Sequence, residues 1–541
     1  MKKDLFKSGI NFTIEYSVFR EAEKWLEKHG VFLVIVFLAI ISICSFLFYY
    51  ENGLGLAYND ARSHLNIGRR VVEGLSTGFA QLGSVWLPLP HLLMIVTVWN
   101  DFLWHSGLAG SFQSMIAFIG TGLLIYLFIK ELGGGLLGRF FGVAIFVFNI
   151  NILYLQSTAM TELLLLMTMT AGAYYILLWQ KRNNLIYLIY SAFWIMLSTL
   201  IRYDGWFLFF FASVLVFLAT WRSYGYKTAE GKTILFCVLG GFGIALWFVW
   251  NQLIFGDALY FIYGPYSAYA QQLQAEEAGA ASTKLNFLFS LKTYIYALAY
   301  NSGAFIMILG FLSMLFFWFS KAVPFVIRIA TTVLIVPLLF NISALYFGHS
   351  ILSIPEISGD TWFNIRYGIM MMPSFAIFLG YLIHKAVRLR FVLVSLIVFV
   401  TFFSFVNGDA VNVDDARFGS SRKNVWEASE WLQDNVSNEK GFVLISAASS
   451  DAIIFSSGLP MKRFIHEGTG VYYKNTLNDL DRWARWIVVR SYSDNDSTWR
   501  EIKDNPEFAH FELIESYPFA DIYQLKDEYP GNLITEPILG E

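Results

Sequence analysis

Long apolar stretches constrain the fold of this chain more than any other feature of its sequence. About twenty consecutive apolar residues cross the hydrocarbon core of a bilayer as a helix. Eleven stretches of roughly this length predict an α-helical polytopic membrane protein. They run over residues 31–50, 108–129, 137–155, 161–180, 184–201, 205–221, 233–252, 294–319, 323–346, 367–385 and 390–406.

The composition supports this class. Of the 541 residues, 56% are hydrophobic and 15% are charged, whereas soluble domains carry about 25% charged residues. The mean hydropathy is +0.53. The apolar composition predicts membrane lipids as partners. The chain has no basic stretch of the kind that binds nucleic acid, so we predict no nucleic-acid partner.

Lysine and arginine are unevenly divided between the loops, and cytoplasmic loops are the ones that carry more of them. The pattern fits a cytoplasmic N-terminus, with residues 1–30 as a cytoplasmic amphipathic segment or, equally, a solvated helix. An odd number of spans then places the C-terminus outside. We predict a multi-pass protein of the plasma (inner) membrane.

Residues 407–541 are more polar and contain turn signals, which predict a small extracytoplasmic α/β domain. We expect a helix over 423–436 and strands over 442–445, 486–489 and 511–514. No catalytic motif is visible there. A substrate-binding cap and a purely structural cap are both open.

Polar side chains gather on the predicted outer side. The first outer loop, residues 51–107, opens with Tyr58-Asn59-Asp60-Ala61-Arg62-Ser63-His64. Its stretch 85–104 is apolar but contains two prolines and His91, which predicts an interfacial or re-entrant segment. Ionisable groups at a bilayer edge are candidates for a functional site. Further candidates lie near the outer ends of later spans: Glu162, Arg202, Asp204, His349, Glu356, Arg366 and Tyr367.

Each of these residues also has a structural interpretation. Asp60 is a favoured N-cap residue, and Glu162 complements the dipole of the helix that it begins. Arg202 and Asp204 could form a pair with each other, and His91 is expected to be packed rather than reactive. Anchoring at the membrane interface is the alternative for Arg62, Arg69, Arg70, His349 and Arg366.

Taken together, the outer carboxylates, arginines and histidines suit chemistry on an anionic lipid headgroup. Arginine binds phosphate through two parallel hydrogen bonds. A carboxylate within hydrogen-bond reach of an acceptor hydroxyl can act as its base. Asp60 is the candidate for that base.

The motif around Asp60, followed by Gln81-Leu82-Gly83-Ser84-Val85-Trp86-Leu87-Pro88-Leu89-Pro90-His91, resembles GT-C glycosyltransferases that use polyprenyl-phosphate sugars. This class includes protein O-mannosyltransferases and lipid A aminoarabinose transferases. Thr161-Glu162 matches the position of its second acid, and Asn364-Ile365-Arg366-Tyr367-Gly368 resembles its Arg-Tyr element. The resemblance covers residues 31–406 in layout.

Two details depart from the class. Asn59-Asp60 stands where the O-mannosyltransferases have an Asp-Glu pair, and Trp-Leu-Pro-Leu-Pro replaces the Lys-Pro-Pro type of the aminoarabinose enzymes. The subfamily, the sugar and the acceptor therefore stay open.

The resemblance implies inverting transfer of a sugar from a polyprenyl or dolichyl monophosphate to a hydroxyl of a glycan, lipid or protein outside the cytoplasm. Asp60 and Glu162 are the expected catalytic residues. We expect Arg366, Arg202, His349 and Tyr367 to bind the donor phosphate. We expect Arg62, His64, His91, Asp204 and Glu356 to bind or orient substrate. We expect no required cofactor, although a divalent metal could find ligands among Asp60, Glu162, His64 and His349.

Other functions fit the same charges. A transporter or lipid-linked-glycan flippase would use them as a gate, but it predicts polar residues near the middle of several spans, where this chain has few. A polysaccharide polymerase or ligase would also act on lipid-linked sugars. A non-catalytic assembly protein is the third alternative.

Overall fold

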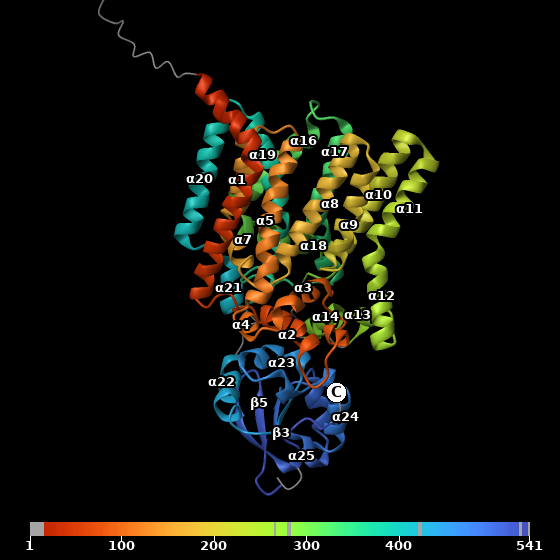
Figure 1. Cartoon of the computed structure of the whole chain (residues 1–541), viewed down its shortest axis with the longest axis vertical. Coiled ribbons are helices and arrows are strands. Elements are labelled where there is room, and N and C mark those ends of the chain that lie inside the picture. Colours follow the sequence, from red (N-terminus) through yellow and green to blue (C-terminus); the bar gives the residue numbers. More distant parts are fainter. Residues whose placement is uncertain (1–15, 265–266, 278–282, 420–424, 530–532, 539–541) are drawn as a thin grey trace, which may run out of the picture.

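The computed structural model describes residues 16–264, 267–277, 283–419, 425–529 and 533–538. A helical bundle, a layer of short helices at one end of it and a small sheet-containing domain follow one another along the long axis (Figure 1). Helix α1 starts at the end of the bundle opposite this domain. Residues 1–15 of the predicted amphipathic segment lie outside the described residues.

Among the described residues, seven helical segments are long and apolar enough to span a membrane, or nine spans if each of two bent pairs counts as one. The helices of the seven segments are α1 (Tyr16–Glu51), α5 (Leu108–Glu131), α8 (Glu162–Arg182), α10 (Asp204–Tyr224), α17 (Phe325–Ala330) with η2 (Thr331–Ile335) and α18 (Val336–Phe347), η3 (Ile365–Met371) with α19 (Met372–Lys385), and α20 (Arg390–Asn407) with α21 (Val411–Phe418). The bent pairs are α11 (Tyr226–Gly240) with α12 (Phe242–Phe255), and α15 (Phe287–Ser302) with α16 (Ala304–Phe319).

The predicted polytopic helical fold with a small C-terminal sheet domain is confirmed, but the predicted count of eleven spans is not. The stretch 137–155 forms α6 (Leu136–Val147) and α7 (Ile150–Leu155), and the stretch 184–201 forms α9 (Leu185–Thr199). With 12, 6 and 15 residues, helices α6, α7 and α9 rise about 18, 9 and 22 Å, at roughly 1.5 Å per residue. Each of these lengths is less than the roughly 30 Å of a hydrocarbon core.

The stretch 294–319, predicted as one continuous span, is broken into two helices that count as one span only if the bent pair is taken together. Helix α15 ends at Ser302, and α16 leaves at an angle of 109°. The break occurs at Gly303, whose φ of +78° lies in the region that glycine adopts without a steric penalty. The break leaves Asn301 at a helix end, where its Nδ2 donates to the Ile365 carbonyl at 2.7 Å.

Residues 51–107, the predicted first outer loop, form most of the layer between the bundle and the sheet domain (Figure 1). The stretch 85–104 is not a span: it contains two short helices, α3 and α4. The helices of the layer are α2 (Asn59–Val72), η1 (Phe79–Leu82), α3 (Leu89–Val98), α4 (Asp101–His105), α13 (Tyr260–Tyr263) and α14 (Ala268–Glu277).

The C-terminal domain contains one five-stranded sheet with the order β2-β1-β3-β5-β4. Strand β1 is parallel to β2 and β3, and β5 is antiparallel to β3 and β4. The strands are β1 (Phe442–Ile445), β2 (Phe464–Ile465), β3 (Ala484–Val489), β4 (Phe511–Ser516) and β5 (Asp521–Leu525). The helices are α22 (Val425–Val436), α23 (Ala447–Ser456), η5 (Met461–Arg463), η6 (Glu467–Thr469), α24 (Val471–Asn478), α25 (Leu480–Trp483), α26 (Ser497–Ile502) and η7 (Pro506–His510).

The predicted helix and the three predicted strands of this domain are confirmed as α22, β1, β3 and β4. Strands β2 and β5 were not predicted. Helix α21 packs against α7 and η3 of the bundle. The first helix after α21 in the described residues is α22.

Replacement of Gly368 by alanine tests the packing of η3 against α15. A Cβ at Gly368 would lie 2.1 Å from the carbonyl oxygen of Ala297, which is backbone that cannot rotate away. Overpacking of this kind costs about 1–3 kcal/mol, so Gly368→Ala should lower the unfolding temperature in detergent. Gly231→Ala in α11 is the matched control, since its Cβ would meet nothing within 4 Å. Equal unfolding temperatures for the two variants would contradict the proposed packing.

Candidate active site

The guanidinium group of Arg366 joins several parts of the chain at the end of the bundle that faces the sheet domain. Its Nη2 donates to Asp60 Oδ2 at 2.6 Å, and its Nε donates to Glu162 Oε1 at 3.0 Å. Its Nη1 lies 3.9 Å from Asp415 Oδ2. Helices α2, α8 and α21 are thereby connected to η3 through one side chain.

Arg202 is a second cation in the same cluster. Its Nη1 donates to Glu162 Oε1 at 3.2 Å, and its Nε donates to Asp204 Oδ2 at 3.4 Å. The ring of Tyr367 lies beside both arginines, with its centroid 4.7 Å from Arg202 Cζ and 5.4 Å from Arg366 Cζ. Glu162 therefore bridges the two guanidinium groups, and an aromatic face supports both.

Local helix geometry explains where the carboxylates lie. Glu162 and Asp204 are the first residues of α8 and α10, and Asp60 is in the first turn of α2. The positive end of a helix dipole favours an anion at each of these positions. Asp60 is not the N-cap of its helix, because the N-cap is Tyr58 and makes no side-chain capping bond. Capping alone therefore does not account for Asp60.

Two asparagines, Asn364 and Asn301, fix the start of η3 and so the place of Arg366. Asn364 precedes η3 with a φ of +57°, a left-handed conformation that asparagine tolerates. Its Nδ2 donates to the Ile351 carbonyl at 2.9 Å. The next carbonyl along the chain, that of Ile365, accepts the bond from Asn301 described above.

Two residues of this cluster, Tyr58 and Asp415, were not among the predicted site residues. Tyr58 donates its hydroxyl to Asp415 Oδ2 at 3.0 Å, and its ring centroid lies 4.9 Å from Arg366 Cζ. Asp415 is fully buried in α21. The available signal for Asp415 was a carboxylate shortly after the last apolar stretch, on the same predicted side as Asp60.

His64 and His91 form a buried pair beside the cluster rather than part of it. His64 Nδ1 and His91 Nε2 are 2.8 Å apart, and the His64 ring packs on Trp86. Burial, followed by the charges of Arg366 and Arg202, lowers the pKa of His64 to about 3. Burial also lowers the pKa of His91, so both rings are neutral near pH 7, and the pair connects α2 to α3.

The remaining predicted residues lie outside the cluster. His349 and Glu356 are exposed in the connection between α18 and η3, where Glu356 has a φ of +63°. Arg62 is half-buried, and its Nε donates to the Leu56 carbonyl at 2.9 Å. The headgroup-anchor interpretation of Arg69 and Arg70 is wrong, because both are buried. Their carboxylate partners are Glu73, Asp101 and Asp451.

Comparison with solved structures places this geometry in a known fold. ArnT from Cupriavidus metallidurans, solved bound to undecaprenyl phosphate, superposes with a TM-score of 0.54 at 9% identity, over 93% of this chain and 99% of that one. The oligosaccharyltransferase AglB from Archaeoglobus fulgidus, solved with an inhibitory peptide and a dolichol-phosphate, gives a TM-score of 0.50 at 11% identity. That match covers 93% of this chain and 75% of AglB. No protein-family model and no curated protein sequence matches the chain.

The chain has the GT-C fold. Both solved structures are of this type, and each match covers most of this chain. At 9–11% identity the likeness extends to the fold alone. It confirms the GT-C architecture that the motif around Asp60 and the span layout predicted.

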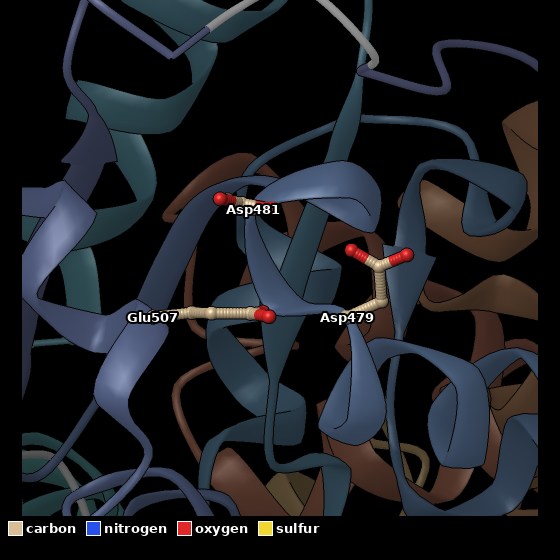
Figure 2. A group of neighbouring side chains, drawn as sticks. All are labelled: Asp479, Asp481 and Glu507. Carbon is tan, nitrogen blue, oxygen red and sulfur yellow. The ribbon is translucent and has the colours of Figure 1, made fainter.

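A different group of acidic residues lies in the sheet domain. The ligand atoms of Asp479, Asp481 and Glu507 lie within 4.8 Å of one another, around the start of α25 (Figure 2). Asp481 accepts from His510 Nδ1 at 2.6 Å, and Glu507 accepts from the Leu480 N–H. In the part of the chain that the structure describes, this is the only group of three such ligands. Asp60, Glu162, His64 and His349 form none.

Buried histidines with lowered pKa values, among them His64, His91 and His466, predict an acid-sensitive fold. Burial lowers the pKa of His64 and of His466 to about 3, whereas an unfolded imidazole titrates near pH 6.5. Below that pH the unfolded chain binds protons that the folded chain does not. The free energy of unfolding should therefore fall by about 1.4 kcal/mol per pH unit for each imidazole.

Thermal unfolding in detergent between pH 7.5 and pH 5 measures this loss. His64→Asn should make the unfolding temperature less dependent on pH, since it removes one of the buried imidazoles whose pKa is lowered. His349→Asn, at an exposed histidine, is the control and should keep the dependence of the unsubstituted protein. Identical pH dependence in both variants would contradict the assignment to His64.

Proposed function

We propose that this protein is an inverting glycosyltransferase of the membrane. It would transfer a sugar from a polyprenyl or dolichyl monophosphate to a hydroxyl of a glycan, lipid or protein acceptor on the extracytoplasmic side. The observation that carries the proposal is the contact of an accessible carboxylate, Asp60, with a buried guanidinium group, Arg366. A second guanidinium group lies on the other side of their shared partner, Glu162.

Arg366 and Arg202 are the groups that bind the donor phosphate. A guanidinium group has five N–H donors, and Arg366 gives two of them to Asp60 and Glu162. Its Nη1 is 3.9 Å from Asp415, beyond hydrogen-bond distance, so this nitrogen can donate to a phosphate oxygen. Two guanidinium groups fixed before the reaction stabilise the charge that develops on the leaving phosphate. The mechanism assigns this role to arginine and requires no metal ion.

Asp60 is the base, because it is the most accessible carboxylate of the cluster. Its side chain is 32% exposed, against 0% for Glu162 and 4% for Asp204. The acceptor oxygen attacks the anomeric carbon from the face opposite the phosphate, and its proton passes to Asp60. The bond between the anomeric carbon and the phosphate oxygen breaks with oxocarbenium character, and the lipid phosphate leaves with the electron pair. The buried Glu162 holds both arginines in place.

An apolar cavity of about 800 Å³ between α10 and α17 supports a lipid donor. It follows α10 from Phe207, one turn after Asp204, to Arg222 near the other end of the helix. Phe325 and Ile329 of α17 line its other wall. This cavity has the chemistry and the extent to hold an isoprenoid chain whose phosphate lies at the arginines.

The comparisons support the same ligand class, because the ArnT structure holds undecaprenyl phosphate and the AglB structure holds a dolichol-phosphate. A transporter fits less well. Its polar groups belong near the middle of the membrane, whereas Glu162 and Asp204 are the first residues of their spans.

Replacement of Asp60 by asparagine tests the base. Asparagine keeps the size of the side chain but accepts no proton, so sugar transfer should fall about 10²–10⁴-fold. Transfer is measured in detergent from a radiolabelled lipid-phosphate sugar, with the unfolding temperature as a check on the fold. Asp101→Asn is the control, because Asp101 is in the same outer loop and pairs with Arg69 away from the cluster. Near-normal transfer by folded Asp60→Asn would exclude Asp60 as the base.

A further inference from the structure

The sheet domain is bonded directly to the helix that carries Asp60. Asp451 lies in α23, and its Oδ1 accepts from Arg70 Nη1 at 2.7 Å and from Asn66 Nδ2 at 2.9 Å. The Asp451 carbonyl accepts from the same amide at 2.7 Å. The side chains of Arg70 and Asp451 are 11% and 7% exposed, and Asn66 is fully buried. The contact is therefore a desolvated charge pair between α2 and the domain.

The geometry of α2 makes this contact an orienting one. Asn66 and Arg70 are four residues apart, so they lie on the same face of the helix. At Gly68, α2 packs closely on α3, where an added Cβ would lie 3.4 Å from the Cβ of Met94. Figure 1 shows α2 and α23 at the junction of the bundle and the sheet domain. Helix α2 is thus held between the bundle and the domain.

Helix α23, which carries Asp451, is anchored at its first turn and kinks at Ser450, just before Asp451. The Glu467 carboxylate accepts from the N–H groups of Ala447 and Ala448, at 2.9 and 2.8 Å. These residues form the first turn of α23, whose free N–H groups need acceptors. A second bond between the domain and the outer loop runs from Gln81 Nε2 to the Gly468 carbonyl at 2.7 Å.

We propose that Asp451 is a positioning residue for Asp60. Through Arg70 and Asn66 it holds α2 at the angle at which Asp60 meets Arg366. Asp60 and Arg70 are ten residues apart, about 15 Å along a helix, so a tilt of about 4° at Arg70 moves Asp60 by about 1 Å. A displacement of that size can cost about 100-fold in rate. The catalytic part of this inference rests on the proposed function.

Asp451→Asn removes the charge and leaves Arg70 buried without its partner, which is unfavourable. We expect faster hydrogen exchange of the α2 amides, measured by mass spectrometry on the full chain in detergent. We also expect kcat for sugar transfer to fall 10- to 100-fold, with KM for the lipid donor changed less than 2-fold. The reason is that Asp451 contacts α2 and not the arginine cluster. Asp451→Glu keeps the charge and should restore most of both properties.

Asp521→Asn is the matched control. Asp521 is as buried as Asp451, both residues being 6% exposed, and it bonds to Ser491 and Ser516 within the sheet domain. It should destabilise the domain and leave α2 exchange and kcat per folded molecule unchanged. Asn66→Ala removes an amide without stranding a charge. Asn66→Ala should give a smaller increase in α2 exchange and a smaller loss of kcat than Asp451→Asn. It replaces Asp451→Asn in the test if that variant does not fold.

The two readouts separate this inference from the function on which it rests. Unchanged α2 exchange in Asp451→Asn and Asn66→Ala, or the same change in Asp521→Asn, would overturn the positioning role. If the unsubstituted protein transfers no sugar, the proposed function fails. Hydrogen exchange still decides in that case whether Asp451 holds α2.

Discussion

The architecture of the site depends on one buried cation. A guanidinium group removed from water is tolerated only where carboxylates and hydrogen bonds compensate its desolvation, and Arg366 obtains them from Asp60 and Glu162. These partners come from helices far apart in sequence, so the ion pairs fix how α2, α8 and η3 meet. A tightly packed backbone supports them, with Gly368 against Ala297 and the amide of Asn301 on the carbonyl of Ile365.

Because Asp60 must meet Arg366, the orientation of α2 matters, and the sheet domain contributes to that orientation. Asp60 lies at one end of α2, and the other end of the helix is bonded to Asp451. The bundle thus supplies the arginines, and the domain orients the carboxylate that meets them. A domain without a catalytic motif of its own can in this way contribute to the rate.

Apolar run lengths were sufficient to predict the membrane class, and local apolar patterns predicted the strands β1, β3 and β4, whereas the GT-C architecture was predicted from the family resemblance of the motif around Asp60. Apolar run lengths did not predict the break at Gly303, because a glycine inside an apolar run reads equally well as helix. Strand β2 has two residues, too few for a pattern of alternation. Helices α6 and α9 matched the composition of a span, but α6 ends at Val147, before a new helix capped by Asn149, and α9 ends at Thr199.

For the site, the position of each polar residue at a span end identified Asp60, Glu162, Arg202, Asp204, Arg366 and Tyr367, which lie together in the structure. Pairings were not predictable, because they depend on which span ends are neighbours. Asp415 was missed since α21 folds back onto the bundle after the last apolar run. His349 and Glu356 lie in a connection whose path leaves both side chains exposed, and span position carries no information about such a path.

The central claim is that Arg366 and Arg202 form the phosphate site of a lipid-linked sugar donor. An experimental structure of the protein with undecaprenyl monophosphate tests it most directly. The account predicts density for the phosphate within hydrogen-bond distance of Arg366 or Arg202, with the isoprenoid chain in the cavity along α10. A phosphate bound away from both arginines, with the contacts of Arg366 to Asp60 and Glu162 unchanged, would contradict it.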